Sequence, residues 1–571
     1  MKMRIIFFCL LAAAAWPLAA APARDLGAFS NVRTGAARMP FYKNNQLEFY
    51  LRSQSMAMRG KHLEAMWPLI DVIRKGVPVE QVSGSDNSTD IYSLNAPVSE
   101  VTAFWAKRAY SEGVVLSENA VFDQAHRVAS GKEKVFLRSP MLDLNGVGFS
   151  ADFNARTVTV NSDVEIILRS SGGRSLGSPL NAIKSSKKSA GKKVAAAADK
   201  AVSVTRAFCN DLTLDMNRNL IILNGNVRIF DPAGTITAQR LEIEILRDKG
   251  KNKKRGMDAV SSSGQKLKLA RFIGKVHAER KLDAQEALQG EQYADADLMI
   301  YTAAADTLEL TGSRPRLVRG KDYAEAERIV AMPEKKIIRF FEKCRFLVHR
   351  AKTPQAPPDL ITADYADWNH PENLIRLIGN AHLQSPAEQA DVQAARLEIY
   401  LAKEENKKSR KNTKGDLLGG SSRPEKIIAN GNVRLKRINQ NVHEKASAGR
   451  MVYLGKEGKI TLDDKPILQR GDDMIRGGGM VYYVDNERLT VDRGSHITIS
   501  GATAGSGDMF AVSGNKDKKA AGKKKDSAPA APITVDSKFA DLNYGGNLIA
   551  FAGSVAVRGR GMLLDSDTLD I

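Results

Sequence analysis

The sequence is poor in the residues that cross-link small folds. Of 571 residues only three are cysteine, and 6% are aromatic. So few cysteines exclude a fold held together by disulfides. With few aromatic residues, the core must come mainly from Val, Ile, Leu and Ala, and the β-branched members of this set favour β-sheets.

Motifs that carry chemistry are also missing. The sequence has no His-Glu-x-x-His pair and no Gly-x-x-x-x-Gly-Lys-Ser/Thr loop, and its eight histidines are scattered. The acidic pairs Asp295/Asp297, Asp463/Asp464 and Asp472/Asp473 stand beside expected turns, where solvated Asp is usual. We therefore expect no catalytic residue, no metal site and no cofactor, and the protein is not expected to be an enzyme.

Long apolar runs are absent except at the start of the chain. Lys2 and Arg4 precede an apolar stretch over 5–21, and Ala19-x-Ala21 and Ala21-x-Ala23 fit a signal-peptidase site. This pattern predicts a signal peptide over residues 1–23 and export to the periplasm. An uncleaved inner-membrane anchor is the alternative, although Pro17 interrupts the stretch. In an exported chain, Cys209 and Cys344 are compatible with a disulfide and equally with two buried thiols.

The net charge of +20 is concentrated outside the apolar segments. Basic, Ser-, Gly- and Ala-rich stretches at 170–203, 247–265, 403–424 and 513–533 carry most of it. Such composition predicts flexible, solvated spacers. These stretches lack the interleaved aromatic residues that stack on bases, so we expect no nucleic-acid partner.

A short sequence recurs along the chain. Leu220-Ile-Ile-Leu-Asn-Gly-Asn-Val-Arg-Ile229 returns as Ile427-Ile-Ala-Asn-Gly-Asn-Val-Arg-Leu435, and weaker copies occupy 374–383, 272–278 and 548–557. Two companions follow in the same order: strands such as 296–301 and 448–453, which end in Tyr, and the related segments 308–320 and 460–471. A repeated strand unit cannot bury its apolar face alone, so the copies are expected to stack.

Each repeat has a glycine between two apolar strand segments. A residue without Cβ can adopt positive φ and form a bulge that curls the sheet, with the apolar face inward. Because side chains alternate along a strand, Val227 and Ile229 should point inward and Arg228 outward. The turn glycines are Gly225, Gly274, Gly379, Gly431 and Gly553.

These motifs resemble the OstA/LptA family of lipopolysaccharide transport. The segment Gly148 to Leu168, read as two strands, and its position after the leader resemble the related LptC family. The N-terminal module also contains an expected strand over 47–58, a strand and turn over 91–97 and a short helix over 102–110. The resemblance implies an all-β fold: tandem V-shaped open β-jellyrolls of solenoid-like antiparallel sheets, whose groove carries acyl chains.

The resulting domain organisation follows the linkers. We expect a leader or anchor (1–23), an LptC-like β module (24–169), a basic linker (170–203), an OstA/LptA-like module (204–350) with the insert 247–265, a second such module (351–512) with the insert 403–424, a second basic linker (513–533) and a partial repeat (534–571).

The apolar positions of the repeats are the expected lining of the groove. They are Ile222, Val227, Ile229, Ile236, Ile243, Ile273, Val276, Leu298, Ile300, Leu308, Leu310, Leu377, Leu383, Leu397, Ile399, Ile428, Val433, Leu435, Met451, Tyr453, Leu462, Phe551, Val555 and Val557.

The expected function is to shield the acyl chains of lipopolysaccharide, or of a similar amphiphile, on the way to the outer membrane. The resemblance implies other bridge components as partners, including an inner-membrane transporter and an outer-membrane receiver, joined by edge-strand addition. The sequence stops midway through a repeat, at Leu569-Asp-Ile571, which is expected to dock onto such a partner or to fray. The alternative function is a structural or adhesive β-repeat scaffold with a closed core.

Overall fold

The computed structural model describes residues 33–43, 46–74, 76–83, 90–123, 125–139, 142–152, 154–155, 157–170, 180, 203–215, 217–246, 266–287, 290–349, 357–401, 424–439, 442–501, 530–544, 548–559 and 562–570. The expected leader and the insert 247–265 lie outside these residues. Within the other three basic stretches, the structure describes only Leu180 and residues at the ends of neighbouring strands. The side chain of Leu180 is fully buried, unlike that of a solvated spacer. The described chain divides into two units, and each is treated by itself.

The first unit contains the described residues up to Ala287, Glu291–Pro315 and Ala331–Glu334. Its strands are β1 (Arg33–Thr34), β2 (Ala37–Lys43), β3 (Gln46–Ser53), β4 (Ser55–Arg59), β5 (His62–Met66), β6 (Leu69–Ile73), β7 (Ser111–Ser117), β8 (Asn119–Asp123), β9 (Val128–Arg138), β10 (Leu142–Asp152), β11 (Thr157–Ser170), β12 (Ser203–Cys209), β13 (Asp211–Asp215), β14 (Leu220–Asp231), β15 (Gly234–Leu246), β16 (Lys266–Arg280), β17 (Gln292–Thr302) and β18 (Thr307–Thr311). Its helices are α2 (Val79–Ser83), α3 (Val98–Lys107) and α6 (Ala284–Ala287).

The second unit contains Arg316–Val330 and the described residues from Lys335 onward. Its strands are β19 (Arg316–Arg319), β20 (Asp322–Glu325), β22 (Ile337–Val348), β23 (Asp359–Asn369), β24 (Leu374–Ser385), β25 (Ala390–Leu401), β26 (Pro424–Asn439), β27 (Val442–Leu454), β28 (Lys459–Asp463), β29 (Ile467–Arg470), β30 (Asp473–Tyr483), β31 (Arg488–Gly501), β32 (Ala530–Ser537), β33 (Phe539–Asn543), β34 (Leu548–Gly559) and β35 (Met562–Asp570). A 3-10 turn, η2 (Pro386–Glu388), joins β24 to β25, and β21 (Arg328–Met332) contains residues of both units.

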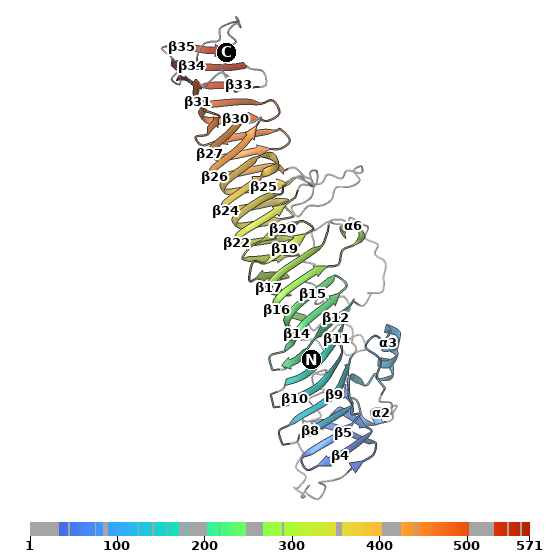
Figure 1. The fold of residues 1–571 in the computed structure, drawn as a ribbon. Helices are drawn as coiled ribbons and strands as arrows, with labels where there is room; N and C mark the ends of the chain where they lie inside the picture. Colours follow the sequence, from blue (N-terminus) through green and yellow to red (C-terminus); the bar gives the residue numbers. More distant parts are fainter. Residues whose placement is uncertain are drawn as a thin grey trace, which may run out of the picture. The chain divides into compact units, whose positions relative to one another are not determined.

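Within each unit, consecutive long strands pair antiparallel, as in the series β14 to β17 and the series β22 to β27 (Figure 1). Short strands such as β28 and β29 each pair with one half of a long strand, β27. The all-β fold class predicted from the sequence is confirmed.

The N-terminal part of the first unit has helices inserted between β6 and β7. Helix α3 begins after Pro97 and ends before Arg108, close to the predicted helix over 102–110. The strands predicted within 47–58 and 148–168 are present as β3, β4, β10 and β11. Of the strand and turn predicted over 91–97, the turn is present, with an Ala96 N–H to Ser93 C=O hydrogen bond of 3.0 Å, but the strand is not.

A bulge divides each repeat strand into two halves. The register shifts between Asn224 and Val227 in β14, and equivalent shifts occur in β16, β24, β26 and β34. A bulge bends its strand, so the halves before and after the glycine belong to two half-sheets. We call them the first and second half-sheet of a unit.

The glycine at the bulge is required by both conformation and space. All five turn glycines have positive φ, between 72° at Gly225 and 81° at Gly553. At Gly379, with φ 76°, an added Cβ would lie 2.4 Å from a carboxylate oxygen of Asp364 on the neighbouring strand. Asn380 follows with φ 46°, and its side chain donates a 2.9 Å hydrogen bond to Asp364. The Gly-Asn pair therefore both forms the bend and fastens it to the next strand.

Candidate functional site

The side chains that face inward form continuous rows across the paired strands. In the first half-sheet of the second unit, one such row is almost fully buried at every strand: Ala366, Leu377, Leu397, Ala429, Met451, Leu462, Met480, Val491, Ala540 and Phe551. This row lies next to the bulge, where the two half-sheets meet. It is the floor of the interior.

Farther from the bulge, the interior of the second unit is partly open. Four apolar side chains of the second half-sheet, on β24, β25, β26 and β29, are only half-buried although they point inward: Leu383, Val392, Leu435 and Leu468. The first half-sheet shows the same change at Ile427, Tyr453, Ile460 and Tyr482. We call this region, from β24 to β29 with its facing residues, the open stretch.

Beyond the open stretch the same rows are sealed. In the second half-sheet, Ile475, Ile497 and Val535 have at most 1% of their surface exposed, and in the first half-sheet Leu489 and Leu542 are fully buried. A change from half-buried to sealed along one continuous row means that access to the interior is local.

A polar cluster stands where the open stretch ends. Arg470 and Glu444, both inward-facing, form an ion pair of 3.6 Å. The Arg470 guanidinium also lies 4.2 Å from the centre of the Tyr544 ring, which comes from the turn after β33. Burial raises the pKa of the Tyr544 hydroxyl above its ordinary value. These contacts join residues of the two half-sheets, so they close the mouth of the interior at this level.

The floor of the interior of the first unit is closed along its repeats. The inward row Leu223, Leu241, Phe272, Met299 and Leu310 is at most 2% exposed. At the rim of the second half-sheet, the Thr205 hydroxyl donates a 2.6 Å hydrogen bond to Asp231, and Arg280 donates one of 2.8 Å to Gln292.

In the N-terminal part of the first unit, the inserted helices pack against inward-facing strand residues. Val82 of α2 packs with Leu47, Tyr50 and Ile73, and Phe104 and Trp105 of α3 pack with Leu69, Val114 and Leu116. The fully buried carboxylate of Asp71 pairs with the buried Arg52 and, at 2.9 Å, with Arg108. Nothing in the sequence signalled this cluster, because its members are far apart along the chain.

Most of the predicted lining residues are inward-facing. Those almost fully buried in the interior are Val227, Ile229, Ile236, Ile243, Val276, Leu308, Leu310, Leu377, Leu397, Ile399, Val433, Met451, Leu462, Phe551, Val555 and Val557. Leu383, Leu435 and Tyr453 are inward and half-buried, within the open stretch.

Five predicted lining residues point outward instead and need correction: Ile222, Ile273, Leu298, Ile300 and Ile428. Their neighbours Leu223, Phe272, Met299, Tyr301 and Ala429 take the inward positions and are at most 1% exposed. At Ile222, Ile273 and Ile428 the error was one of register, because strict alternation from the inward Val227, Val276 and Val433 already places these three outward. At Leu298 and Ile300, which lie on a return strand, the bulge explains the error. On the return strands two inward positions are three residues apart across the bend, as in Ala238 and Leu241, so strict alternation fails there.

Sequence reasoning also missed residues of the site. Val392, Ile427 and Ile460 belong to the open stretch, and their signal was available as apolar positions paired with Leu435 or Tyr453. Leu468, also of the open stretch, pairs with Ala446. The cluster of Arg470, Glu444 and Tyr544 had no local signal, since it depends on which half-sheets face each other.

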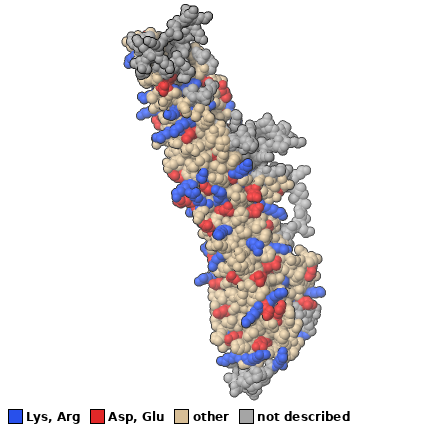
Figure 2. All heavy atoms as spheres, in the orientation of Figure 1, with Lys and Arg blue, Asp and Glu red and all other residues tan. Residues whose placement is uncertain are grey.

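The polar residues considered for chemistry have structural partners. Asp295 pairs with His277 at 2.7 Å, Asp297 accepts a 2.6 Å hydrogen bond from the Ser313 N–H, and Asp463 pairs with Arg493 at 2.9 Å. Within the described ranges, no group of three or more His, Cys, Asp or Glu is placed to hold a metal ion. Both basic and acidic side chains occur along the face shown in Figure 2.

Cys209 and Cys344 are buried free thiols, which decides between the alternatives left open by the sequence. Burial raises the pKa of both thiols to about 12. Of the helices that the structure describes, none has the length and apolarity needed to cross a membrane.

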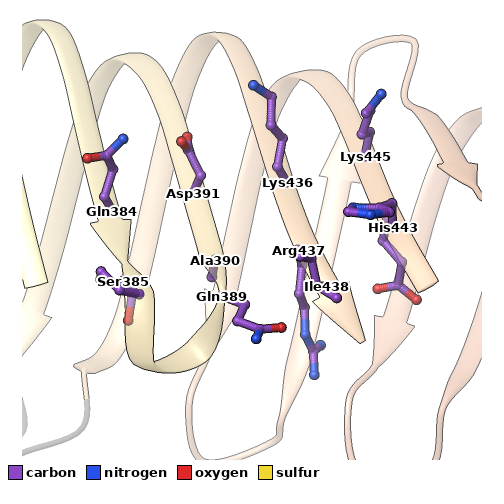
Figure 3. A pocket seen from close by; sticks show the side chains of 12 residues that line it. Gln384, Ser385, Gln389, Ala390, Asp391, Lys436, Arg437, Ile438, His443 and Lys445 are labelled. Atoms are coloured by element: carbon purple, nitrogen blue, oxygen red, sulfur yellow. The ribbon is translucent and has the colours of Figure 1, made fainter. Parts of the chain in front are cut away.

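A pocket of about 420 Å³ adjoins the open stretch at the tip of the second half-sheet. It is lined by residues around the turns that join β24 to β25 and β26 to β27 (Figure 3). The lining residues are Gln384, Ser385, Pro386, Gln389, Ala390, Asp391, Lys436, Arg437, Ile438, His443, Glu444 and Lys445.

The match to a family model coincides with the repeats. Residues 209–337 and 360–488 each match the model of the family described as LptA/(LptD N-terminal domain) LPS transport protein. Among solved structures, the chain is similar to LptH, the LptA homologous periplasmic component of the lipopolysaccharide transport device from Pseudomonas aeruginosa. Identity is 12%, 24% of this chain and 82% of the LptH chain are covered, and the TM-score is 0.19. No curated protein matches the chain.

The family match covers both segments that contain the Gly-Asn-Val repeats, with Gly225 and Gly274 in the first and Gly379 and Gly431 in the second. The predicted relation to OstA/LptA is therefore confirmed. The LptC-like character of residues 24–169 lies outside the match and stays a prediction. The chain carries, in tandem, two segments that match the LptA/LptD N-terminal family of lipopolysaccharide transport, and in these segments it is LptA-like.

Proposed function

We propose that this LptA-like protein works in the periplasm and shields acyl chains of lipopolysaccharide, or of a similar amphiphile, at the open stretch of its second unit. The observation that carries the proposal is the row Leu383, Val392, Leu435 and Leu468, which points inward and is only half-buried. A closed core would bury these side chains as completely as it buries Ile497.

The dimensions of the open stretch suit an acyl chain. The row crosses β24, β25, β26, β27 and β29, and four strand spacings of about 4.8 Å span about 19 Å. An extended chain of about twelve to fourteen carbons, with C–C bonds of about 1.5 Å, has a similar length. Full burial of such a chain would contribute on the order of 10 kcal/mol, at about 0.8 kcal/mol per CH₂. That gross gain is enough to hold a chain while its headgroup remains in water.

The interaction is non-directional, so neighbouring positions along the row bind alike and cargo can slide between them. No side chain needs to act as a catalyst. The energy that lifts a lipid from a membrane must come from another component, and an inner-membrane transporter is the partner that fits this need.

We further propose that the edge of β35 receives a strand of a partner, such as an outer-membrane receiver. Among the described strands β35 pairs with β34 on one side only, and it exposes 69% of Leu563 and 40% of Leu564. An unpaired edge with exposed apolar residues favours strand addition. Deleting residues 534–571 should abolish partner binding in a pull-down and leave the family-matched segments folded by circular dichroism. Full binding after the deletion would contradict this proposal.

Binding of n-alkyl maltosides with 10, 12 and 14 carbons to the full chain tests the groove. If the chain enters the open stretch, each added CH₂ should raise the affinity by about fourfold, because about 0.8 kcal/mol per CH₂ corresponds to that ratio. Titration below the micelle concentration measures it directly.

A closed structural scaffold is the second candidate, and the fully buried row Ile229, Ile236 and Ala278 in the second half-sheet of the first unit favours it. A scaffold would bind the three maltosides equally weakly. Absence of a dependence on chain length would therefore decide for the scaffold and against the groove.

A further inference from the structure

The interior of the second unit changes from open to sealed between neighbouring strands. In the second half-sheet, Leu468 of β29 is half-buried, whereas its direct partner Ile475 on β30 has 0% of its surface exposed. In the first half-sheet, Tyr482 of β30 is half-buried and its partner Leu489 on β31 is 0% exposed. All four side chains point inward, so the change is caused by what lies over them.

A ladder of charged side chains lies one inward row farther from the bulge. It crosses β26, β27, β29 and β30 as direct cross-strand partners of alternating charge: Arg437, Glu444, Arg470 and Asp473. Figure 3 shows Arg437 on the opposite side of β26 from Lys436. The side chains of Arg470 and Glu444 are only 18% and 14% exposed. This part of the ladder is therefore largely removed from water.

Tyr544 covers the ladder from the opposite half-sheet. Its ring centre lies 4.2 Å from the Arg470 guanidinium, a cation–π contact that gains strength away from water. Its backbone N–H donates a 3.1 Å hydrogen bond to the carbonyl oxygen of Glu487, just before β31. The ring is thus held by its backbone at the first half-sheet and by its face at the second, where it closes the mouth.

An acyl chain that advanced past Leu468 would have to lift Tyr544 from Arg470 and cover the ladder with hydrocarbon. Separating buried charges from their partners costs more than a few additional CH₂ groups contribute by burial. Beyond this point Ile475 and Ile497 are already packed to 0% exposure, so the interior offers no free space. The chain must therefore stop here.

The other end of the open stretch is sealed as well. Ile361, the partner of Leu383 on β23, is 4% exposed, and Ile399, the partner of Ile427 on β25, is 8% exposed. An acyl chain in the open stretch lies between two fixed ends, and the row between them spans about 19 Å at about 4.8 Å per strand spacing.

We propose that Tyr544, held by Arg470, is a stop that limits the acyl chains of the open stretch to about fourteen carbons. The inference rests on the proposed function, since the apolar row supplies the place for the chain. The row selects only for hydrocarbon, whereas the stop selects for length. A smaller side chain at position 544 should lengthen the stretch by about one strand spacing, which corresponds to about three carbons.

The test uses n-alkyl maltosides with 12, 14, 16 and 18 carbons and the full chain. Each ligand, kept below its micelle concentration, displaces a dodecyl maltoside that carries a fluorescent headgroup. The variants are Tyr544→Ala, which removes the stop, and Tyr544→Phe, which retains the ring. The matched control is Phe539→Ala, because Phe539 is 39% exposed on the outward face of β33.

In the unaltered protein the affinity should rise about 16-fold from 12 to 14 carbons and by less than about twofold from 14 to 18. In Tyr544→Ala it should rise about 16-fold again from 14 to 16 carbons. Tyr544→Phe and Phe539→Ala should both keep the limit at 14 carbons. If circular dichroism shows that Tyr544→Ala is unfolded, Tyr544→Leu takes its place.

The outcomes separate the stop from the groove. An affinity that keeps rising to 18 carbons in the unaltered protein refutes the stop and leaves the groove, as does an unchanged limit in the folded Tyr544→Ala or Tyr544→Leu protein. Loss of the limit in Phe539→Ala also overturns the assignment to Tyr544. No rise between 12 and 14 carbons refutes the groove, and the stop with it.

Discussion

Replacing one side chain of the open stretch and one of the sealed row by alanine should separate lipid binding from folding. Leu435 and Ile497 both point inward from the second half-sheet of the second unit, but Leu435 is half-buried and Ile497 has 0% of its surface exposed. Leu435→Ala removes a wall that an acyl chain would touch. Ile497→Ala removes core packing that no ligand reaches.

The two variants should differ in which property they change most: Ile497→Ala should lower stability more, and Leu435→Ala should weaken binding more. Ile497→Ala should lower the free energy of unfolding by about 3 kcal/mol through the cavity it leaves. Leu435→Ala should lower it by only about 1 kcal/mol, because water already reaches part of the side chain. For binding, loss of about 40 Å² of apolar contact with the ligand at Leu435 corresponds to about 1 kcal/mol, or about fivefold in Kd.

Urea unfolding and calorimetric titration with dodecyl maltoside give the two quantities for each variant. The reasoning is refuted if Ile497→Ala weakens binding by as much as Leu435→Ala at equal folded fraction. It is also refuted if Leu435→Ala leaves the Kd unchanged.

Three further predictions concern the fold. Gly379→Val should lower the free energy of unfolding in urea by about 2 kcal/mol or more, because a β-branched residue is strained at φ 76° and its Cβ would meet Asp364; unchanged stability would disprove the bulge requirement. Burial, helped by Lys336, lowers the pKa of His370 to about 4, so the unfolded chain takes up a proton near its ordinary value of 6.5 while the folded chain does not. Stability should therefore fall between pH 6.5 and 4, and His370→Gln should flatten that fall in urea titrations; the same slope in the variant would count against it. Cys209 and Cys344, buried thiols with raised pKa, should resist alkylation by iodoacetamide at pH 8 until denaturant is added; rapid labelling of the native protein, read by mass spectrometry, would be inconsistent with their burial.

The repeat made much of the fold predictable from sequence. The Gly-Asn-Val motif specifies a bend with two successive residues at positive φ, and the alternation after it correctly placed Val227 and Ile229 inward. The same alternation failed at Leu298 and Ile300, since it takes no account of the bulge opposite them. Local patterns report which residues are apolar, but the register across a bend decides which way they face.

Long-range features of the site could not be predicted in this way. Whether an inward residue is half-buried, like Leu435, or sealed, like Ile497, depends on what the opposite half-sheet places over it. In the sealed region, the contact of Arg470 with Tyr544 brings together residues 74 positions apart. The pairing of Lys436 with Lys445 could have been predicted from the sequence, because both residues lie in the hairpin that joins β26 to β27.

The most direct test of lipid shielding is photo-crosslinking in cells that contain labelled lipid. A photoreactive residue at Leu435 should form lipid adducts, whereas one at Ile428, on the outward face of the same strand, should form none. Adducts at both positions, or at neither, would contradict the account.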